Sequence, residues 1–272
     1  MCVPGCQEAV RSTLSRRGFF RTAAAAGFAA SAVAAPDDLA LAAPRARRVV
    51  DLTHTMSPEF PTFFGTPGIE FERKFDFQKD GFNMFQWKLI EHAGTHLDAP
   101  IHFSTDGATA EKIAPEALVV PLVVINVASR AEENPDYLLS RDDLREWERK
   151  HGRIPANACV AMNSGWARHV GSPKYMGKDA GGVFHFPGFS PLAAEWLMKE
   201  RKVAGIAVDT LSLDNGPSKE FRTHTTWLPS GRWGLENVAN LDKVHESGAT
   251  LVVGLAKVKD ATGGPARLIA LL

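Results

Sequence analysis

The segment EHAGTHLDAPIHF, residues 91–103, brings together His92, His96, Asp98 and His102, three of the nine histidines of the chain and one acid. Imidazole nitrogens and a carboxylate oxygen form a donor set that suits a divalent ion such as Zn²⁺ or Mn²⁺. A hydrogen-bonded cluster inside the core is the alternative interpretation. The spacing of the whole set favours the metal site.

Gly94 and Pro100 interrupt this segment, and both residue types disfavour a continuous helix. His92 and His96 are therefore not predicted to lie one helical turn apart. The segment is predicted to be a strand that leads into a shaped loop. Side chains from such a loop can converge on an ion.

Seven further segments are predicted to be strands because they are rich in apolar and β-branched residues. Several are apolar throughout, which predicts that both of their faces are covered. The predicted strands are residues 47–55, 82–90, 117–127, 158–165, 203–210, 249–258 and 266–272.

Three helices are predicted between these strands. Ser140 and Asp143 have the spacing of a capping box, Ser190 and Pro191 are typical of a helix start, and Gly248 ends the third pattern. The sequence has no internal linker, so we expect a single mixed α/β domain with more strand than helix. The predicted helices are residues 141–150, 192–202 and 236–246.

The composition limits the class of partner. The chain has 272 residues, is 44% hydrophobic, and has 31 basic and 31 acidic residues. It is long enough to bury a full core, and its balanced charge provides neither a basic field for nucleic acid nor a polybasic patch for a membrane surface. The predicted partner is a small molecule, and nucleic acid is excluded.

The N-terminal segment is predicted to be a twin-arginine export signal. Arg16 and Arg17 precede an alanine-rich run over residues 23–35, and small residues offer a cleavage site near residue 43. A membrane anchor is the alternative, but the run is too short for about 30 Å of hydrocarbon, so no stable membrane span is expected. Residues 1–43 would be the signal and 44–272 the mature domain, delivered by the twin-arginine export machinery to a periplasmic or extracellular location.

Two other chemistries are excluded by the sequence. Cys2 and Cys6 lie in the predicted signal, so Cys159 alone would remain, and neither a disulfide framework nor a thiolate metal site is expected. Ser164, in MNSGW, lacks the Gly-x-Ser-x-Gly setting of a nucleophilic serine, which excludes a serine hydrolase of that type.

The pattern His-x-Gly-Thr-His-x-Asp-x-Pro-x-His over residues 92–102 resembles the signature of the cyclase-like metal hydrolases, which include bacterial kynurenine formamidases and isatin hydrolases. The resemblance continues through His224 and, twelve residues later, Glu236. Three further segments share it: residues 51–58, 186–197 and 205–214.

The resemblance implies a metal centre with one or two ions, Zn²⁺ or Mn²⁺, per chain. It implies that His92, His96 and Asp98 hold the first ion. It further implies that Asp98 bridges to a second ion, which His224 and Glu236 would hold.

The resemblance also implies a catalytic residue and an assembly. His102 would be the general acid and base, since a histidine can take a proton from water and return it to a leaving group. The implied fold is a swivelling β/β/α domain, and the implied assembly is a homodimer or a larger homo-oligomer.

Aromatic side chains near the motifs predict where an aromatic substrate would lie. Kynurenine formamidases of this type carry a tryptophan and a Pro-Gly-Asp element after the first strand, whereas this chain has PTFFGTPG over residues 61–68. The difference disfavours N-formylkynurenine, and a cyclic or other small amide fits at least as well. The candidate substrate contacts are Phe63, Phe64, Trp87, Phe103 and His185.

The leading hypothesis is a metal-dependent hydrolase that cleaves an amide C–N bond, in a cyclic amide or an N-formyl aryl amide, with activated water and a histidine acid–base. A lactone or ester hydrolase, or a cyclase, using the same site is the second hypothesis. The third is an exported metal- or ligand-binding protein without turnover, which the presence of His102 disfavours.

Overall fold

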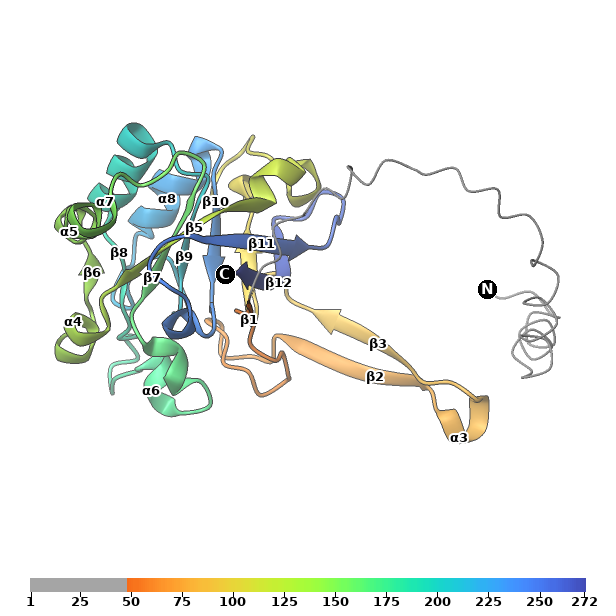
Figure 1. Cartoon of the computed structure of the whole chain (residues 1–272). Coiled ribbons are helices and arrows are strands. Elements are labelled where there is room, and N and C mark those ends of the chain that lie inside the picture. Colours follow the sequence, from red (N-terminus) through yellow and green to blue (C-terminus); the bar gives the residue numbers. More distant parts are fainter. Residues whose placement is uncertain (1–47) are drawn as a thin grey trace, which may run out of the picture. The chain divides into compact units, whose positions relative to one another are not determined.

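The computed structural model describes residues 48–272 (Figure 1). The predicted export signal, residues 1–43, lies outside the described residues. Within residues 48–272, no helix combines the length and the apolar character that crossing a membrane requires.

A barrel-like sheet forms the centre of the domain. Its eight strands follow the order β1-β12-β11-β5-β7-β9-β10-β4, and the sheet closes because β12 also pairs with β4. The strands are β1 (Val49–Asp51), β4 (His96–Asp98), β5 (Val119–Asn126), β7 (Cys159–Asn163), β9 (Gly205–Val208), β10 (Trp233–Glu236), β11 (Ala249–Leu255) and β12 (Gly263–Leu271).

One half of this sheet is parallel and the other half is antiparallel. β5, β7, β9 and β10 run parallel, and helices lie in the connections between them. β4, β12 and β11 are joined by antiparallel pairing. Helices α5 (Arg141–His151), α7 (Pro191–Trp196) and α8 (Arg222–Trp227) pack on the outer side of the parallel half (Figure 1). The short helix α4 (Ala128–Glu133) follows β5, and α6 (Pro173–Met176) precedes α7.

The parallel strands bury both faces, as the sequence predicts. In β7, Cys159 and Ala161 join the core inside the barrel, while Val160 and Met162 join the core beneath the helices. This alternation follows from the two-residue period of a strand. The continuous apolar segments are therefore explained by two cores that share one sheet.

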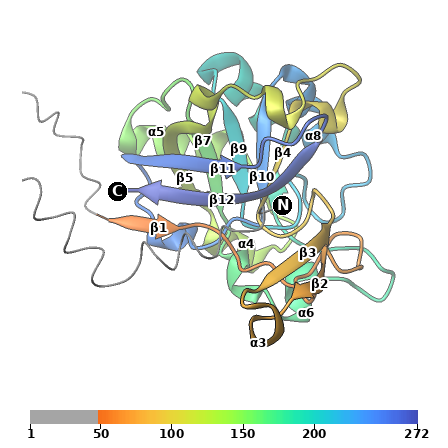
Figure 2. The same ribbon diagram turned by 90° about the vertical axis from the view of Figure 1, so that its right-hand side faces the viewer.

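Two strands form a separate hairpin, which we call the arm. β2 (Ile69–Phe75) and β3 (Met84–Leu89) pair only with each other among the described strands. The short helix α3 (Phe77–Asp80) lies at the tip. Both views show the arm projecting away from the barrel (Figures 1 and 2).

The mixed α/β, strand-rich domain is confirmed, and each of the seven predicted strands overlaps an observed strand. The sequence did not predict β2, β10 or the two-residue strands β6 (Leu138–Leu139) and β8 (Gly188–Phe189). Segment 91–103 has its strand only at β4, followed by a 3₁₀ turn over Pro100–Phe103.

Two of the predicted helices are confirmed and one is wrong. Ser140 and Asp143 form the reciprocal capping box of α5. α7 continues into a π-helical turn over Leu197–Arg201, so this helix also lies where predicted. The predicted helix over 236–246 does not form, because Asn237 and Asn240 have φ angles of 54° and 55°, in the left-handed region.

Gly205 is required by close packing inside the barrel. A β-carbon at this position would overlap the indole ring of Trp233, which is buried. We expect Gly205→Ala to lower the free energy of unfolding by about 1–3 kcal/mol, the usual cost of overpacking. The measurement is urea unfolding.

The matched control is Gly254→Ala, also in a strand, whose added methyl group would meet nothing closer than the Arg267 carbonyl oxygen at 3.2 Å. We expect a much smaller change in the free energy of unfolding for this variant. Equal losses in the two variants would contradict the packing argument.

Candidate active site

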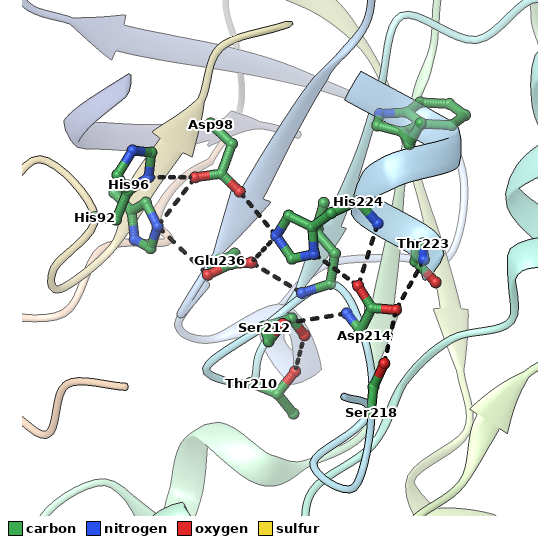
Figure 3. A network of polar contacts seen from close by, with 12 residues as sticks. His92, His96, Asp98, Thr210, Ser212, Asp214, Ser218, Thr223, His224 and Glu236 are labelled. Carbon is green, nitrogen blue, oxygen red and sulfur yellow. Dashed lines mark hydrogen bonds and ion pairs between the residues drawn. The ribbon is translucent and has the colours of Figure 1, made fainter. Parts of the chain in front are cut away.

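The register between β4 and β10 gathers the first functional side chains. Glu236 lies directly opposite His96 in this antiparallel pair. Leu97 and Leu235 point into the barrel core, so His96, Asp98 and Glu236 project from the opposite face of the sheet. Figure 3 shows these three side chains converging.

His224 reaches the same point from α8 and is oriented by Asp214. Its Nδ1 lies 2.7 Å from Asp214 Oδ2, and its Nε2 lies 3.0 Å from Glu236 Oε1 and 3.5 Å from Asp98 Oδ2 (Figure 3). The carboxylate of Asp214 also accepts hydrogen bonds from the backbone N–H groups of Thr223 and His224. Asp214 thus caps the helix and fixes the imidazole ring.

His96 is held by the backbone. Its Nδ1 lies 2.8 Å from the Gly94 carbonyl oxygen, which can only accept, so Nδ1 carries the proton. Its Nε2 is therefore the nitrogen that faces Asp98 Oδ1 at 3.3 Å and Glu236 Oε2 at 3.4 Å.

His92 is held through its Nε2 by a chain of hydrogen bonds that includes Thr262 and Glu91. The hydroxyl group of Thr262 donates to the Glu91 carboxylate and lies 2.9 Å from His92 Nε2. Since the Thr262 hydroxyl group donates its proton to Glu91, its oxygen accepts a hydrogen bond from His92 Nε2–H. The remaining nitrogen, Nδ1, lies 2.6 Å from Asp98 Oδ1.

The side chains fit a divalent ion. His96 Nε2 and Asp98 Oδ2 are buried and have no hydrogen-bond partner, and an unpaired buried polar atom costs about 1–3 kcal/mol. Ligand atoms of His92, His96 and Asp98 lie within 4.8 Å of one another, as do those of Asp98, His102 and His224. An ion bound by nitrogen and oxygen would satisfy these atoms together.

Two buried carboxylates give the site a strong attraction for positive charge. Burial opposes the charged form of His96, yet attraction to the nearby carboxylates of Asp98 and Glu236 outweighs it and raises its pKa to about 10. The pKa of His224 is also raised, against burial, by Asp214, Asp98 and Glu236. Burial alone would raise the pKa of Asp98, but its three histidine neighbours hold that pKa well below the usual range.

His102 differs from the other histidines of the site. Its ring stacks on the ring of His92, with centroids 3.7 Å apart and planes 20° from parallel. Burial lowers its pKa to about 4, although the negative charge of Asp98 acts in the opposite direction. At neutral pH His102 is therefore an uncharged imidazole that can accept a proton.

A cavity of about 280 Å³ opens over these histidines. Phe63, Phe64 and Phe103, all candidate substrate contacts, line it together with Phe221. The lining includes no lysine or arginine. The cavity thus offers aromatic walls and a floor of imidazole and carboxylate groups.

The structure places the other two candidate substrate contacts elsewhere. Trp87 lies on the arm and is 63% exposed. His185 Nδ1 lies 2.9 Å from Asp136, and this ion pair is outside the cavity lining. Neither side chain reaches the cavity of its own chain.

Sequence reasoning missed two residues of this site. Asp214 lies ten positions before His224, and the contact between the two residues forms across irregular chain. Phe221 has a φ of 48°, a region that bulky side chains rarely adopt, and this brings its ring over the cavity. No local pattern signals either arrangement.

Residues 50–215 match the family model named Cyclase, described as "Putative cyclase". The chain belongs to this family. It is 32% identical to the isatin hydrolase of Roseibium aggregatum over 82% of this chain and 91% of that protein. It is 25% identical to the kynurenine formamidase of Delftia acidovorans over 66% of this chain and 76% of that protein.

A solved structure agrees with this assignment. An isatin hydrolase bound to the product analogue thioisatinate superposes with a TM-score of 0.77 and 29% identity, covering 83% of this chain and 92% of that one. The predicted family and the strand-rich fold are both confirmed by these comparisons.

The Asp214→Asn variant tests how His224 is positioned. A carboxylate accepts hydrogen bonds from both backbone N–H groups and from the imidazole ring, whereas asparagine has only one acceptor oxygen. The His224 ring should therefore no longer be held in one orientation. We expect affinity for a divalent ion to fall by about 10- to 100-fold. The measurement is calorimetric titration with Zn²⁺ and Mn²⁺, beside thermal unfolding.

The control for this experiment is Ser218→Ala, which removes only a hydroxyl group that donates to Asp214 at 3.3 Å. We expect nearly unchanged ion affinity for Ser218→Ala. If Asp214→Asn lost thermal stability but kept full ion affinity, Asp214 would serve only as the cap of α8.

Proposed function

We propose that this protein is a metal-dependent hydrolase that cleaves the C–N bond of an amide, and that its substrate is an uncharged aromatic cyclic amide. The observation that carries the proposal is that the cavity with aromatic walls is also lined by Glu236 and by the histidines of the cluster. The relation to isatin hydrolases supports the amide class.

The residues divide the chemistry between them. A divalent ion at this site would supply Lewis acidity, which lowers the pKa of water and polarises a carbonyl group. His102, uncharged at neutral pH, takes a proton from the attacking water as the new C–O bond forms. It returns that proton to the departing nitrogen as the C–N bond breaks, leaving an amine and a carboxylic acid, which releases its proton to solvent as the carboxylate forms.

The cavity lining supports an uncharged substrate. Phe63, Phe64, Phe103 and Phe221 can enclose a ring, whereas no lysine or arginine in the lining could pair with the carboxylate of an amino acid. The charged end of a formylated amino acid would therefore be buried against an apolar wall without a partner of opposite charge. A fused ring such as isatin meets no such cost.

The number of ions is part of this proposal. His92, His96 and Asp98 would hold the first ion, and Asp98 would bridge to a second ion held by His224 and Glu236. The contacts of His224 Nε2 with Glu236 and Asp98, at 3.0 and 3.5 Å, support the second position. Nitrogen and oxygen donors together suit Zn²⁺ or Mn²⁺.

Substitutions at His96 and His102 separate ion binding from proton transfer. We expect His96→Ala to lose ion and turnover together, because a buried donor is removed. We expect His102→Ala to keep its ion but lose about 10²- to 10⁴-fold in kcat, the usual span of general acid–base catalysis. The measurement is metal content beside kcat for isatin and for a set of aryl amides.

The pH profile adds a second test of His102. Since burial lowers its pKa to about 4, the uncharged base persists well below pH 6.5, and we expect kcat of the unmodified enzyme to fall only as the pH drops toward 4. His102→Ala should lack this limb. Loss of the ion from His102→Ala would instead identify His102 as a ligand.

We also propose that the protein is exported by the twin-arginine route to the periplasm or the outside of the cell, and that it acts as a homodimer or larger homo-oligomer. The paired arginines and the alanine-rich segment after them support the route. This route carries proteins already folded, which would suit an enzyme that binds its ion before export.

Replacing Arg16 and Arg17 together with lysine tests the export route. We expect the full-length precursor to accumulate inside the cell, because the signal requires the arginine pair. The measurement is immunoblotting of cell fractions, with Arg21→Lys as a control for a single conservative change in the same segment. Normal processing of the double variant would contradict this route.

A further inference from the structure

A second cavity lies at the opposite end of the parallel strands from the active site. It is a groove of about 590 Å³ whose lining includes Ala204, just before β9, and Trp233, the first residue of β10. Glu236, at the other end of β10, belongs to the active site. Among the described residues, none lines both cavities. The groove is therefore separate from the aromatic cavity, and its volume is within the range of small-molecule sites.

Every charged residue in the lining of this groove is basic, and we call it the basic groove. The chain as a whole has 31 basic and 31 acidic residues, so its composition does not account for this excess. Only one of the four cations pairs with a carboxylate of the described residues, namely Lys199 with Glu195 at 3.3 Å. The basic residues of the groove are Lys112, Lys199, Lys202 and Arg232.

Arg232 is partly buried, and its contacts are with neutral acceptors. Its guanidinium group donates to the carbonyl oxygens of Met198, Val203 and Ser230 and to the Ser230 hydroxyl group. These four contacts leave one of its five N–H groups without an acceptor. Burial lowers the pKa of Arg232, because a buried charge is costly when no opposite charge lies nearby. An anion in the groove would reduce this cost.

Lys202 adopts a backbone conformation that usually belongs to glycine. Its φ is 55°, in the left-handed region, where it ends the π-helical turn over Leu197–Arg201. Glycine is favoured at such helix ends because it has no β-carbon, whereas a lysine there costs free energy. Backbone strain of this kind is concentrated at functional positions. The lysine retains a positive charge at the groove that a glycine would not provide.

The basic groove has a fixed floor and apolar as well as charged walls. The indole Nε1–H of Trp233 donates to the Ala117 carbonyl oxygen at 3.1 Å, which joins the start of β10 to the segment after β4. Ile113, Met198 and Val203 contribute apolar side chains to the lining. The groove can therefore contact an apolar body while its cations face a charged group.

We propose that the basic groove binds a small molecule that joins an anionic phosphate or carboxylate group to an apolar part. Such a group accepts charge-assisted hydrogen bonds from arginine and lysine, and Arg232 still has an N–H group to donate. The cations line a groove that is also apolar, which suits an enclosed ligand better than a flat lipid surface. The proposed amide reaction uses none of these residues, so this inference goes beyond the proposed function.

Calorimetric titration of the metal-loaded enzyme with phenyl phosphate tests the site. Lys202→Gly removes a cation and also relieves the strained backbone, so we expect an unchanged or higher Tm but an affinity about three- to fivefold weaker. A variant that is at least as stable and yet binds less well cannot owe its loss to misfolding. Lys112→Gln should weaken binding by a similar factor, and the double variant by about tenfold or more.

The matched control is Lys257→Gln, which removes the charge of an exposed lysine outside the groove lining. We expect this variant to bind phenyl phosphate as the unmodified enzyme does. Phenyltrimethylammonium, which has the same ring and the opposite charge, should not bind. If Lys202→Gly and Lys112→Gln both kept full affinity, the anion would bind elsewhere, for example at the ion of the active site, and the proposal would be wrong.

Nuclear magnetic resonance of the unmodified enzyme locates the ligand without any variant. On titration with phenyl phosphate, and separately with phenylacetate as the carboxylate, we expect backbone amide shifts within residues 112–117, 198–204 and 230–233. Shifts confined to residues 92–102 would overturn the proposal, as would the absence of binding by both probes. Binding to phosphatidylglycerol vesicles that phenyl phosphate fails to displace would instead assign the groove to a membrane surface.

Discussion

The buried carboxylate of Asp98, surrounded by three imidazole rings, is the interaction on which the rest of the site depends. Its two oxygens face His92 and His96 on one side and His224 on the other. A charge this deeply buried is costly unless its neighbours are held in place. Each ring is accordingly fixed through its far nitrogen, to Thr262, to the Gly94 carbonyl or to Asp214. Each ring therefore has a different partner at its far nitrogen, and the other nitrogen of each ring faces the Asp98 carboxylate.

Closure of the sheet explains how distant segments reach that acid. β4 pairs with β10 on one side and with β12 on the other, so Asp98 lies opposite Gly234 and Gly263. Both neighbours are glycines, and a β-carbon at Gly263 would press on the ring of His92. The absence of a side chain at Gly263 thus leaves room for the His92 ring beside the acid. The same register places Glu236 beside His96 without any loop having to bend toward the site.

Much of this could be predicted from sequence because it is local. Several features each depend on only a few consecutive residues. They are the apolar segments of β5, β7 and β9, the capping box of α5, and the spacing of His92, His96, Asp98 and His102. The rest depends on contacts between distant parts of the chain. β10 is short, and the segment after Glu236 has a helical composition that two left-handed asparagines interrupt. Asn237 is held there because it donates to the Gly94 carbonyl and accepts from Tyr175, contacts that no local pattern contains.

The site therefore has a rigid floor and a less constrained roof. In the floor, His96, Asp98 and Glu236 lie on paired strands whose register fixes them to one another. His102 lies in the 3₁₀ turn after β4 and His224 in α8. The roof consists of Phe63, Phe64, Phe103 and Phe221, drawn from loops and a helix start, and Phe221 adopts a backbone conformation that costs free energy. The strained backbone of Phe221, together with the exposure of Phe64 at the cavity, supports our proposal that the aromatic wall selects the substrate. We propose that His96, Asp98 and Glu236 on the paired strands hold the ion in place, and that the choice of substrate depends on the segments that carry the four phenylalanines.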